Sequence, residues 1–484
     1  MNLSSPRLKE YNLIKTVLES AKKKKKKLYL VGGILRDMLL NRDKKNLDFD
    51  FCLRKGAIGF GRKLAEEVRA GFVVLDKEHG ACRLVKKMDT GICTLDFSDF
   101  REKTIEGDLR HRDFTINALA LELEKNWRWD NKNLTNLVID PYGGREDLRA
   151  KRIRFVNKKG FDEDPLRILR AFSLSAILGF KIDKETLKLI KLKANKLPHV
   201  SFERIRDELF KILDGPNSFD YFIQLDKLKI LPIIIPEIEE MRGVKQGPYH
   251  HLDVLRHSLE TIRQFEYLIE ELKNNSQVQD YLDEIISGQR KRSALIKLGA
   301  LLHDIGKPST LRREGGKTKF HGHERKGLDI TRGIARRLRL SNDELTSLEK
   351  MVFWHLRPGY LADNEEITAR ARFRYFRDAA EEAVSILLIS ISDQRSTRGR
   401  LTSKTSRIYH EKVALNLIKE YFRRKQEKRL PRLVTGHDLL NKFKLEPSPL
   451  IGKILSEIEE LQAIGKIKSK KEALVEAKRM IKKR

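Results

Sequence analysis

Two aspartates separated by one residue, Asp48 and Asp50, are the first residues whose spacing could support catalysis. They fall in residues 47–53, an alternating run with aromatic residues that predicts a β-strand. Residues two apart on a strand point to the same face, so both carboxylates should project together while Phe49 turns into the core. Adjacent carboxylates repel each other unless a cation lies between them, and hard oxygen ligands suit Mg²⁺. Such ions can activate an attacking hydroxyl and neutralise charge on a transferring phosphate.

A glycine pair upstream of these aspartates could hold phosphate. Residues 28–31 form a short apolar run that ends in Gly32 and Gly33 and leads into a helix pattern with Arg36 and Asp37. Glycines let backbone N–H groups approach phosphate oxygens, and a helix N-terminus favours anions. Arg36 on the first turn could add a bidentate contact. Standing alone, such a motif is more often a tight turn without a ligand.

Two later segments add polar residues. They are residues 107–119, with Arg112, Asp113 and Asn117, and residues 163–170, with Asp164, Arg167 and Arg170. Pro165 suits the first turn of a helix, and residues three apart on a helix are neighbours. Asp164 and Arg167 could therefore present acceptors and donors to a nucleobase edge. The alternative is an intrahelical ion pair, which is common.

The elements that must position these residues change character along the chain. Residues 71–75, 81–85 and 91–97 are further strand candidates, so the first part of the chain is expected to mix α and β structure. From Asp162 onward the apolar residues recur at helix spacing as far as the C-terminus. The outline is a small β-containing head followed by a long helical body.

The ordered motifs Gly-Gly-x-x-Arg-Asp, Asp-x-Asp, Arg-Asp-Phe-Thr-Ile-Asn-Ala and Glu-Asp-Pro-x-Arg resemble those of the class II tRNA nucleotidyltransferases and bacterial poly(A) polymerases. The likeness extends to residues 203–209, which are similar to the last head-and-neck motif of that family. It implies an α+β fold with a small mixed β-sheet head like that of DNA polymerase β. A largely α-helical neck and body would follow.

The resemblance also implies roles for single residues. Asp48 and Asp50 would hold the catalytic Mg²⁺ ions, and Asp96, which ends a β-like run, is the candidate third carboxylate. The remaining nucleotide-binding residues would be Gly32, Gly33, Arg36 and Asp37 at the triphosphate, Arg112, Asp113 and Asn117 beside the sugar and phosphates, and Asp164, Arg167 and Arg170 at the base. Asp164 and Arg167 would select the base by imitating a template strand.

Two features depart from the family pattern. His111 stands where the family usually has a second arginine. The stretch between Asp96 and Asp108 is short, whereas in the family this region holds a flexible loop associated with switching from C to A addition. A short loop favours a partial enzyme that adds only CC, or only A, with a partner that completes the end.

A second group of chemistry-bearing residues lies in the helical part of the chain. Its members are His257, His303, Asp304, His323, His355 and Asp393. Gly306 and Pro308 should stop the helix that carries His303, and His323 falls in a segment expected to be a loop. Mixed imidazole and carboxylate ligands suit a divalent transition metal or Mg²⁺, and a bound metal can generate hydroxide near neutral pH.

The order His…His-Asp…Asp resembles the HD phosphohydrolase superfamily over residues 248–395. The resemblance implies a first metal on His257, His303, Asp304 and Asp393, and a second metal served by His323 and His355. Joined tRNA nucleotidyltransferase and HD domains occur in bacterial members, so each resemblance supports the other. The identity of the metal and the substrate, for example a 2′,3′-cyclic phosphate or a 2′-nucleotide, are left open, as is a vestigial HD domain.

Composition narrows the partners and the compartment. Lys and Arg total 100 against 69 Asp and Glu, a net charge of +31 that favours polyanions such as RNA. Lysine-rich proteomes also produce basic enzymes of every kind. No run of about 18 apolar residues could span a bilayer. No secretory signal is recognised at the start, and the three cysteines indicate no disulfide framework, so cytoplasm is the expected compartment.

We therefore expect four regions. They are a nucleotidyltransferase head (1–145), a helical neck for RNA and base recognition (146–245), an HD domain (246–400) and a basic helical tRNA-binding region (401–484). The predicted activity is addition of CMP and AMP from CTP and ATP to the 3′ end of tRNA. The alternatives are a poly(A) polymerase and a basic RNA-binding protein with decayed sites, and the intact Asp48 and Asp50 pair argues against the latter. The oligomeric state is left open.

Overall fold

The computed structural model describes residues 5–42, 48–88, 91–123, 136–363, 366–427 and 431–482. The chain divides into two compact units, Met1–Leu209 and Phe210–Arg484. The α+β class is confirmed, with one small mixed sheet and a largely helical remainder. The division into four regions stays a prediction. Leu47, the predicted start of a strand, and residues 483–484 of the predicted basic tail lie outside the described residues.

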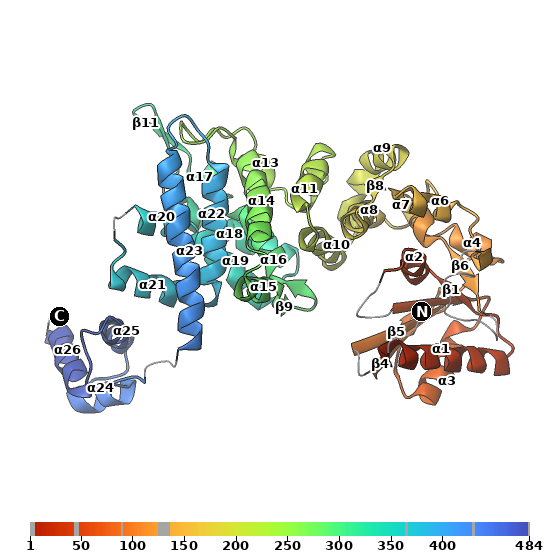
Figure 1. The fold of residues 1–484 in the computed structure, drawn as a ribbon, viewed down its shortest axis with the longest axis horizontal. Coiled ribbons are helices and arrows are strands. Elements are labelled where there is room, and N and C mark those ends of the chain that lie inside the picture. The colour runs from red at the N-terminus through yellow and green to blue at the C-terminus, as the bar shows by residue number, and fades with distance from the viewer. Residues whose placement is uncertain are drawn as a thin grey trace. The chain divides into compact units, whose positions relative to one another are not determined.

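A six-stranded mixed sheet forms the centre of the first unit (Figure 1). Its strands are β1 (Tyr29–Val31), β2 (Asp48–Leu53), β3 (Gly71–Asp76), β4 (Ala81–Met88), β5 (Gly91–Asp99) and β6 (Ala120–Glu122), in the order β3-β4-β5-β2-β1-β6. Strands β2 and β5 pair in parallel, and the other neighbours are antiparallel. The strands predicted at residues 47–53, 71–75, 81–85 and 91–97 are confirmed from Asp48 onward, and the apolar run at residues 28–31 forms β1. The sixth, β6, has only three residues, too few to show an alternating pattern.

One face of this sheet is covered by helix α3 (Ala57–Val68), which in turn contacts α1 (Ser5–Lys23). Phe97 of β5 packs against Phe60 of α3 and stacks on Phe51 of β2, with ring centroids 5.3 Å and 5.0 Å away. A Cβ on Gly61 would lie 2.5 Å from the Cys82 sulfur, so glycine allows α3 to approach β4 closely. Because side chains alternate along a strand, the residues between these apolar positions point to the opposite face.

The remaining elements of the first unit are mostly short helices. They are α2 (Gly33–Leu39), α4 (Ile105–Leu109), η1 (Thr115–Asn117), α6 (Gly144–Arg149), β7 (Arg152–Ile153), α7 (Gly160–Glu163), α8 (Arg167–Leu178), β8 (Lys181–Ile182), α9 (Lys184–Lys193), η2 (Ala194–His199) and α10 (Phe202–Asp214). Strands β7 and β8 form a separate parallel pair. Helix α10 continues across the boundary between the two units.

The second unit is mostly helical. Its elements up to residue 426 are α11 (Ser218–Lys227), α12 (Leu231–Ile234), α13 (Ile238–Met241), α14 (Val254–Glu271), α15 (Ser276–Asp283), β9 (Ile285–Ser287), β10 (Arg290–Lys291), α16 (Arg292–Leu302), α17 (Lys307–Thr310), β11 (Arg312–Glu314), β12 (Lys317–Lys319), α18 (His323–Arg337), α19 (Asn342–Trp354), α20 (Arg357–Ala362), α21 (Ala369–Ala379), η3 (Ala380–Glu382), α22 (Ala383–Ser396) and α23 (Lys404–Gln426). Helix α22 is buried along most of its length and packs against α14 and α23.

Two short hairpins interrupt the helical pattern expected from Asp162 onward. Strands β9 and β10 turn at Gly288, and β11 and β12 turn at Gly315 and Gly316. All three glycines have positive φ angles, which glycine adopts without the steric penalty of a side chain. Strands this short leave no alternating signal in the sequence.

The last three helices, α24 (Gly436–Phe443), α25 (Pro449–Ala463) and α26 (Lys470–Lys482), share a small apolar core of their own. Leu439, Ile454 and Ala473 are fully buried within it. The helical pattern predicted for the basic tail 462–484 is confirmed over Lys470–Lys482, whereas residues 464–469 before it are not helical. None of the described helices is long and apolar enough to cross a membrane.

Candidate functional site

Three carboxylates lie together on the face of the sheet opposite α3. The parallel register sets Asp50 of β2 beside Asp96 of β5 and Asp48 beside Thr94. The Thr94 hydroxyl donates to Asp48 Oδ1 at 2.5 Å. Asp48 is exposed, and the other two aspartates are partly exposed. The predicted pair and the candidate third carboxylate are therefore brought together on one accessible surface.

Arg83 on β4 forms the closest ion pair in this group, and the sequence analysis did not identify it. It stands opposite Asp96, and its Nε and Nη2 donate to the two oxygens of Asp96 at 2.8 Å and 2.7 Å. No sequence motif marks Arg83, because the contact depends on the register between β4 and β5. This bidentate pair uses both Asp96 oxygens, so a cation bound there would compete with the guanidinium.

Asp50 is the most electrostatically perturbed of the three carboxylates. Loss of hydration raises its pKa, and the negative charges of Asp96 and Asp48 raise it further, while the Arg112 guanidinium lowers it. Both effects that raise the pKa penalise the ionised form. A cation among the carboxylates would relieve this penalty, so the chemistry of the donor set fits a divalent metal.

Gly32 brings the preceding turn against these carboxylates. Its φ angle is +79°, and a Cβ at this position would lie 2.9 Å from Asp50 Oδ2 and 3.4 Å from Arg112 Nη1. Any larger residue would therefore be strained and would push on the Asp50 carboxylate. The diglycine turn therefore lies next to the aspartates, as expected for residues that bind the same ligand.

The predicted triphosphate residue Arg36 lies inside a polar network. Its side chain is buried, and Nη1 donates to Asn117 Oδ1 at 2.7 Å while Nε and Nη2 donate to Asp37. Asn117 Nδ2 in turn donates to Asp113 Oδ1 at 3.0 Å. Arg170 of α8 completes the chain of contacts with two hydrogen bonds to Asp113 Oδ2, at 2.9 Å and 2.7 Å. Motifs far apart in the sequence are thereby joined.

Asp113 is the central member of this network. Burial would raise its pKa, but the charge of Arg170 and hydrogen bonds from Asn117 and the Phe114 backbone lower it to about 2. Arg170 also lies 3.9 Å from Glu208 of α10, within the last family-like motif. The ionised Asp113 therefore fixes α8 to the segment that carries Arg112.

The two residues predicted to select the base, Asp164 and Arg167, both form hydrogen bonds with other residues of the protein. Asp164 was expected on the same helix face as Arg167, but α8 begins only at Arg167 and Asp164 has an extended backbone at the end of α7. The Asp164 carboxylate accepts a hydrogen bond from Arg204 at 2.8 Å. Arg167 is buried and donates to the carbonyls of His111 and Arg112 at 2.6 Å and 3.5 Å.

The structure shows the surroundings of both departures from the family pattern, which are His111 and the short stretch after Asp96. The His111 ring lies between carboxylates, 3.0 Å from Glu102 and 3.4 Å from Glu163. The connection after the third carboxylate is short, because β5 ends at Asp99 and α4 begins at Ile105.

All six predicted metal ligands of the second unit converge in its interior. They come from α14 (His257), the end of α16 (His303, Asp304), the first residue of α18 (His323), the end of α19 (His355) and α22 (Asp393). His323 was expected in a loop, but it begins α18 after the left-handed Gly322. Among the residues that the structure describes, two clusters of ligand atoms fit a metal ion, and both include Asp304.

The distances describe one site with two halves. In the first half, His257 Nε2 lies 2.9 Å from Asp393 Oδ1, and His303 Nε2 lies 3.2 Å from Asp304 Oδ2. In the second half, Asp304 Oδ1 lies 3.3 Å from His323 Nε2 and 3.6 Å from His355 Nε2. Asp304 thus turns one oxygen to each half, as a carboxylate that bridges two cations would.

Three of the histidines are held in the orientation of metal ligands. The Nδ1 atoms of His303, His323 and His355 lie 2.7–2.8 Å from the backbone carbonyls three residues earlier. A carbonyl can only accept, so Nδ1 carries the proton and the lone pair of Nε2 faces the site. His303 Nε2 and Asp304 Oδ1 are buried without a hydrogen-bond partner among the described residues. Buried orphan groups of this kind fit a bound cation.

Three further residues line this site and were not named from the sequence. Lys307 Nζ donates to Asp304 Oδ2 at 2.5 Å and to Gln246 Oε1 at 2.6 Å. The His250 ring packs against His257 with centroids 4.8 Å apart, and burial lowers the pKa of His250 to about 3. Lys307 follows the His-Asp pair closely in the sequence, a signal that could have identified it. Gln246 carries no such signal.

Family models cover most of the chain. The model described as the poly A polymerase head domain matches residues 28–154, and a probable RNA and SrmB-binding site of polymerase A matches residues 179–242. The HD domain model matches residues 254–383, and a model described as tRNA nucleotidyltransferase domain 2, putative, matches residues 336–477. Both predicted kinds of catalytic domain are therefore recognised.

Relatives extend this likeness over nearly the whole length. The A-adding tRNA nucleotidyltransferase of Deinococcus radiodurans is 30% identical over 92% of this chain and 93% of its own. The CC-adding tRNA nucleotidyltransferase of a Synechocystis species is 27% identical over 93% of each chain. The solved Thermotoga maritima CCA-adding enzyme with tRNA has the same fold, with a TM-score of 0.62 at 20% identity over 99% of this chain and 97% of its own.

Proposed function

The chain belongs to the family of tRNA nucleotidyltransferases and poly(A) polymerases, and from this premise we propose that it adds CMP, AMP or both, from CTP and ATP, to the 3′ end of tRNA without a template. The observation that carries the proposal is the group formed by Asp48, Asp50 and Asp96 beside the Gly32 turn. The names of the relatives and the domain matched over residues 336–477 favour tRNA over generic RNA as the substrate.

Nucleotidyltransferases of this kind and HD proteins generally use divalent metals, and we propose that Mg²⁺ is held by Asp48 and Asp50, with Asp96 as a third ligand once it leaves Arg83. A cation held by these carboxylates would supply a lowered pKa of the attacking 3′ hydroxyl and a countercharge for the phosphates. Arg112 is the cation whose charge acts most strongly on Asp50, so we assign it to the phosphates. Gly32 leaves the space that a phosphate needs beside these groups.

We also propose that Asp164 and Arg167 select the incoming base. Both belong to the Glu-Asp-Pro-x-Arg motif, and Arg167 is fixed against the carbonyls of His111 and Arg112. A guanidinium held in this way offers its remaining N–H groups in a constant direction. Arg36, Asp37, Asn117 and Arg170 complete the proposed nucleotide site through the network around Asp113, and Gly33 completes it as the second glycine of the turn.

The first test incubates the protein with labelled CTP or ATP separately, once on tRNA that lacks its CCA end and once on tRNA that ends in CC. Incorporation from CTP only identifies a CC-adding enzyme, and incorporation from ATP only, on tRNA ending in CC, identifies an A-adding enzyme. No incorporation from either nucleotide would refute the proposal. Long A tails on a generic RNA, with no preference for tRNA, would favour the poly(A) polymerase.

Variants of the aspartates test the site itself. Asp48→Ala and Asp50→Ala are expected to abolish incorporation while tRNA binding survives, because the carboxylates hold metal and not the RNA backbone. Asp76→Ala removes a carboxylate from the end of β3 that is bonded to His79, and it should leave incorporation unchanged. Comparable activity in wild type and both site variants would overturn the metal assignment.

For the second unit we propose a divalent-metal phosphohydrolase. His257, His303, Asp304 and Asp393 would hold one metal, and Asp304, His323 and His355 the other. His303→Asn should lower the bound metal measured by elemental analysis and abolish hydrolysis of 2′,3′-cyclic nucleotides. His321→Asn, an exposed histidine outside both clusters, is the matched control and should change neither. Full metal content in His303→Asn would contradict the assignment.

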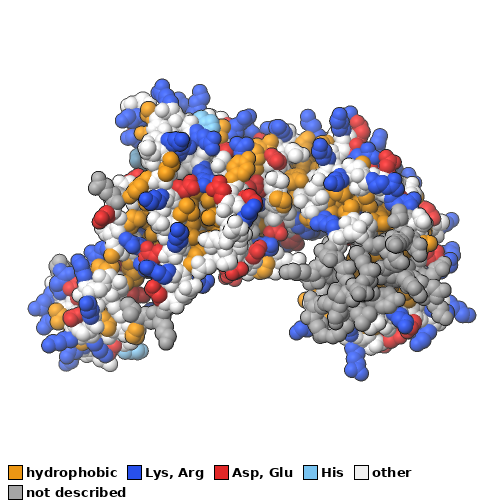
Figure 2. Space-filling view, viewed as in Figure 1, with side chains coloured by type: hydrophobic (Ala, Val, Ile, Leu, Met, Phe, Trp, Pro, Cys, Tyr) orange, Lys and Arg blue, Asp and Glu red, His pale blue; other side chains and the backbone are white. Residues whose placement is uncertain are grey.

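Contact with RNA is proposed for the basic surface, including α26. Lys and Arg side chains are distributed over the face seen in Figure 2, including the C-terminal helices. Each phosphate neutralised by the protein releases counterions, so the logarithm of the binding constant should fall linearly with the logarithm of the salt concentration. Binding of tRNA that does not weaken with salt would contradict a phosphate-contacting surface.

A further inference from the structure

A cavity of about 510 Å³ lies in the second unit, beside the proposed metal site but separate from it. This volume is within the range of small-molecule sites. Its walls come from the start of α18, the end of α19, α20 and α21, and the six predicted metal ligands do not line it. Glu324 and Trp354 do line it, and they are the sequence neighbours of the metal-site residues His323 and His355.

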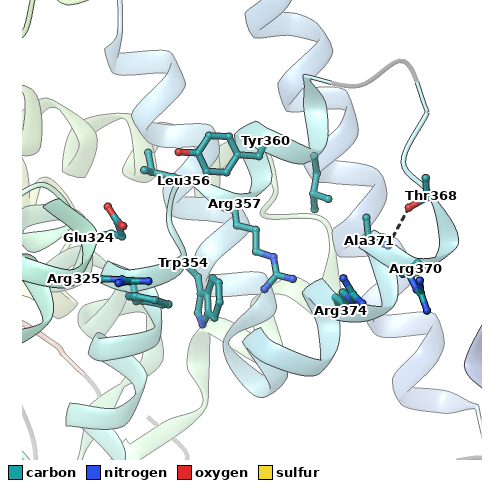
Figure 3. Close-up of a pocket in the computed structure, with 12 residues that line it drawn as sticks. Glu324, Arg325, Trp354, Leu356, Arg357, Tyr360, Thr368, Arg370, Ala371 and Arg374 are labelled. Atoms are coloured by element: carbon teal, nitrogen blue, oxygen red, sulfur yellow. Dashed lines mark hydrogen bonds between the residues drawn. The ribbon is translucent and has the colours of Figure 1, made fainter. Parts of the chain in front are cut away.

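Aromatic side chains form one part of the wall. The Arg357 guanidinium lies 4.6 Å from the centre of the Trp354 ring, close enough for a cation–π contact. Tyr360, one turn of α20 later, leaves more than half of its side chain exposed. Figure 3 shows Trp354 and Arg357 next to each other in the cavity wall, with Tyr360 on the same helix as Arg357. Such surfaces suit a flat ligand, because arginine planes and aromatic rings stack on nucleobases.

Arginines also line the cavity. Arg357 and Arg374 each have an acidic partner, Asp378 or Glu460, at 2.7 Å. Each guanidinium has five N–H donors, so these pairs leave others for a ligand. Arg325 is exposed, and its side chain has no ion-pair or hydrogen-bond partner among the described residues. An exposed guanidinium without an acidic partner attracts an anionic group of a ligand.

We propose that this cavity binds a nucleotide, either a free nucleoside phosphate or the terminal nucleotide of an RNA. The base would lie against Trp354 and Tyr360, and the phosphate against Arg325 and Arg374. An inorganic anion would leave the aromatic wall unused, and a purely apolar ligand would bury the Arg325 guanidinium without an anionic partner. Glu324 can accept a hydrogen bond from the exocyclic amino group of adenine, cytosine or guanine, so a base with such a group is favoured over uracil.

Fluorescence of one tryptophan can report this binding directly. The chain has three tryptophans, so replacing Trp127 and Trp129 by phenylalanine leaves Trp354 as the only indole. Titration of this full-length variant with AMP should give a saturable change in fluorescence. The nucleotidyltransferase assay is read from incorporated label and this titration from the Trp354 signal, so failure of one is distinguishable from failure of the other.

A matched pair of variants tests the role of Arg325. Arg325→Ala in the same background should weaken AMP binding at least about tenfold, since a hydrogen bond to a charged group is lost. Lys326→Ala removes the same charge from the next, exposed residue of α18, which does not line the cavity, and should leave the affinity unchanged. Equal affinities in Arg325→Ala and its parent would overturn the proposal, as would the absence of any response to AMP.

Ligand fragments and RNA complete the test. Adenosine, without phosphate, and ribose 5-phosphate, without a base, should each bind more weakly than AMP, because each lacks one of the two recognised groups. Inorganic phosphate that binds as tightly as AMP would refute recognition of the base. A short RNA that saturates the signal at lower concentration than AMP identifies an RNA end as the occupant, and the reverse order identifies the free nucleotide.

Discussion

Substitution of Arg170 by methionine should destabilise the first unit by breaking its contact with Asp113. Arg170 donates two hydrogen bonds to one carboxylate oxygen, at 2.9 Å and 2.7 Å. The Asp113 pKa falls from 3.8 to about 2, which corresponds to about 2 kcal/mol of stabilisation of the ionised form. Loss of a buried pair costs about 3–5 kcal/mol, but Arg170 is 37% exposed, so a coupling energy of about 2 kcal/mol is expected.

A double-mutant cycle measures this coupling. Unfolding by urea, followed by a probe in the first unit, is compared for Arg170→Met, Asp113→Asn and the double variant. Arg149→Met, an exposed arginine of the same unit, replaces Arg170→Met in a control cycle that should show additivity. Additive effects of Arg170→Met and Asp113→Asn, within about 0.5 kcal/mol, would refute the claim that this pair joins α8 to the catalytic segment.

The pH dependence provides an independent check. Because folding lowers the Asp113 pKa, its contribution is complete above about pH 4 and is lost as the pH falls towards 2. The wild type should therefore lose more stability than Arg170→Met over this window. Equal losses would contradict the electrostatic explanation.

Three further outcomes are expected. Gly32→Ala should reduce incorporation severely, because its Cβ would lie 2.9 Å from a carboxylate oxygen at a positive φ, whereas Gly59→Ala, with open space around it, should keep full activity in the same assay. Asp304→Asn should lower bound metal to near zero in elemental analysis, since both clusters share this residue; retention of metal would contradict a bridging role. Glu460→Gln should release the last three helices to limited proteolysis, because this buried carboxylate accepts the arginines of α21, and the exposed Glu459→Gln should be cleaved no faster than wild type.

Short motifs allowed most of the candidate site to be predicted from the sequence. Asp48 and Asp50 were expected on one strand face, and their strand was recognised by alternation, which is a local property. His303 and Asp304 were expected to join His257 in one cluster, and they do. In each case the residue types and a local period carried the information.

Tertiary pairing could not be predicted in the same way. Arg83 meets Asp96 only because β4 and β5 pair in one particular register, and no residue near Arg83 marks that register. Arg36 and Arg167 were chosen for their type, but the sequence does not show that Asn117 and backbone carbonyls receive their N–H groups. A sequence motif thus indicates what a side chain can do chemically, but it does not indicate which group that side chain contacts. The roles of these arginines towards a nucleotide stay predictions.

The backbone carbonyls that hold His303, His323 and His355 have a consequence for metal exchange. Each ring already has its tautomer and direction before an ion arrives, so capture of the ion requires no search among side-chain rotamers and, for rings that are neutral at the start, no release of a proton. Apo and loaded forms should then differ little in shape. One metal could replace another through ligand exchange alone, without movement of the surrounding helices.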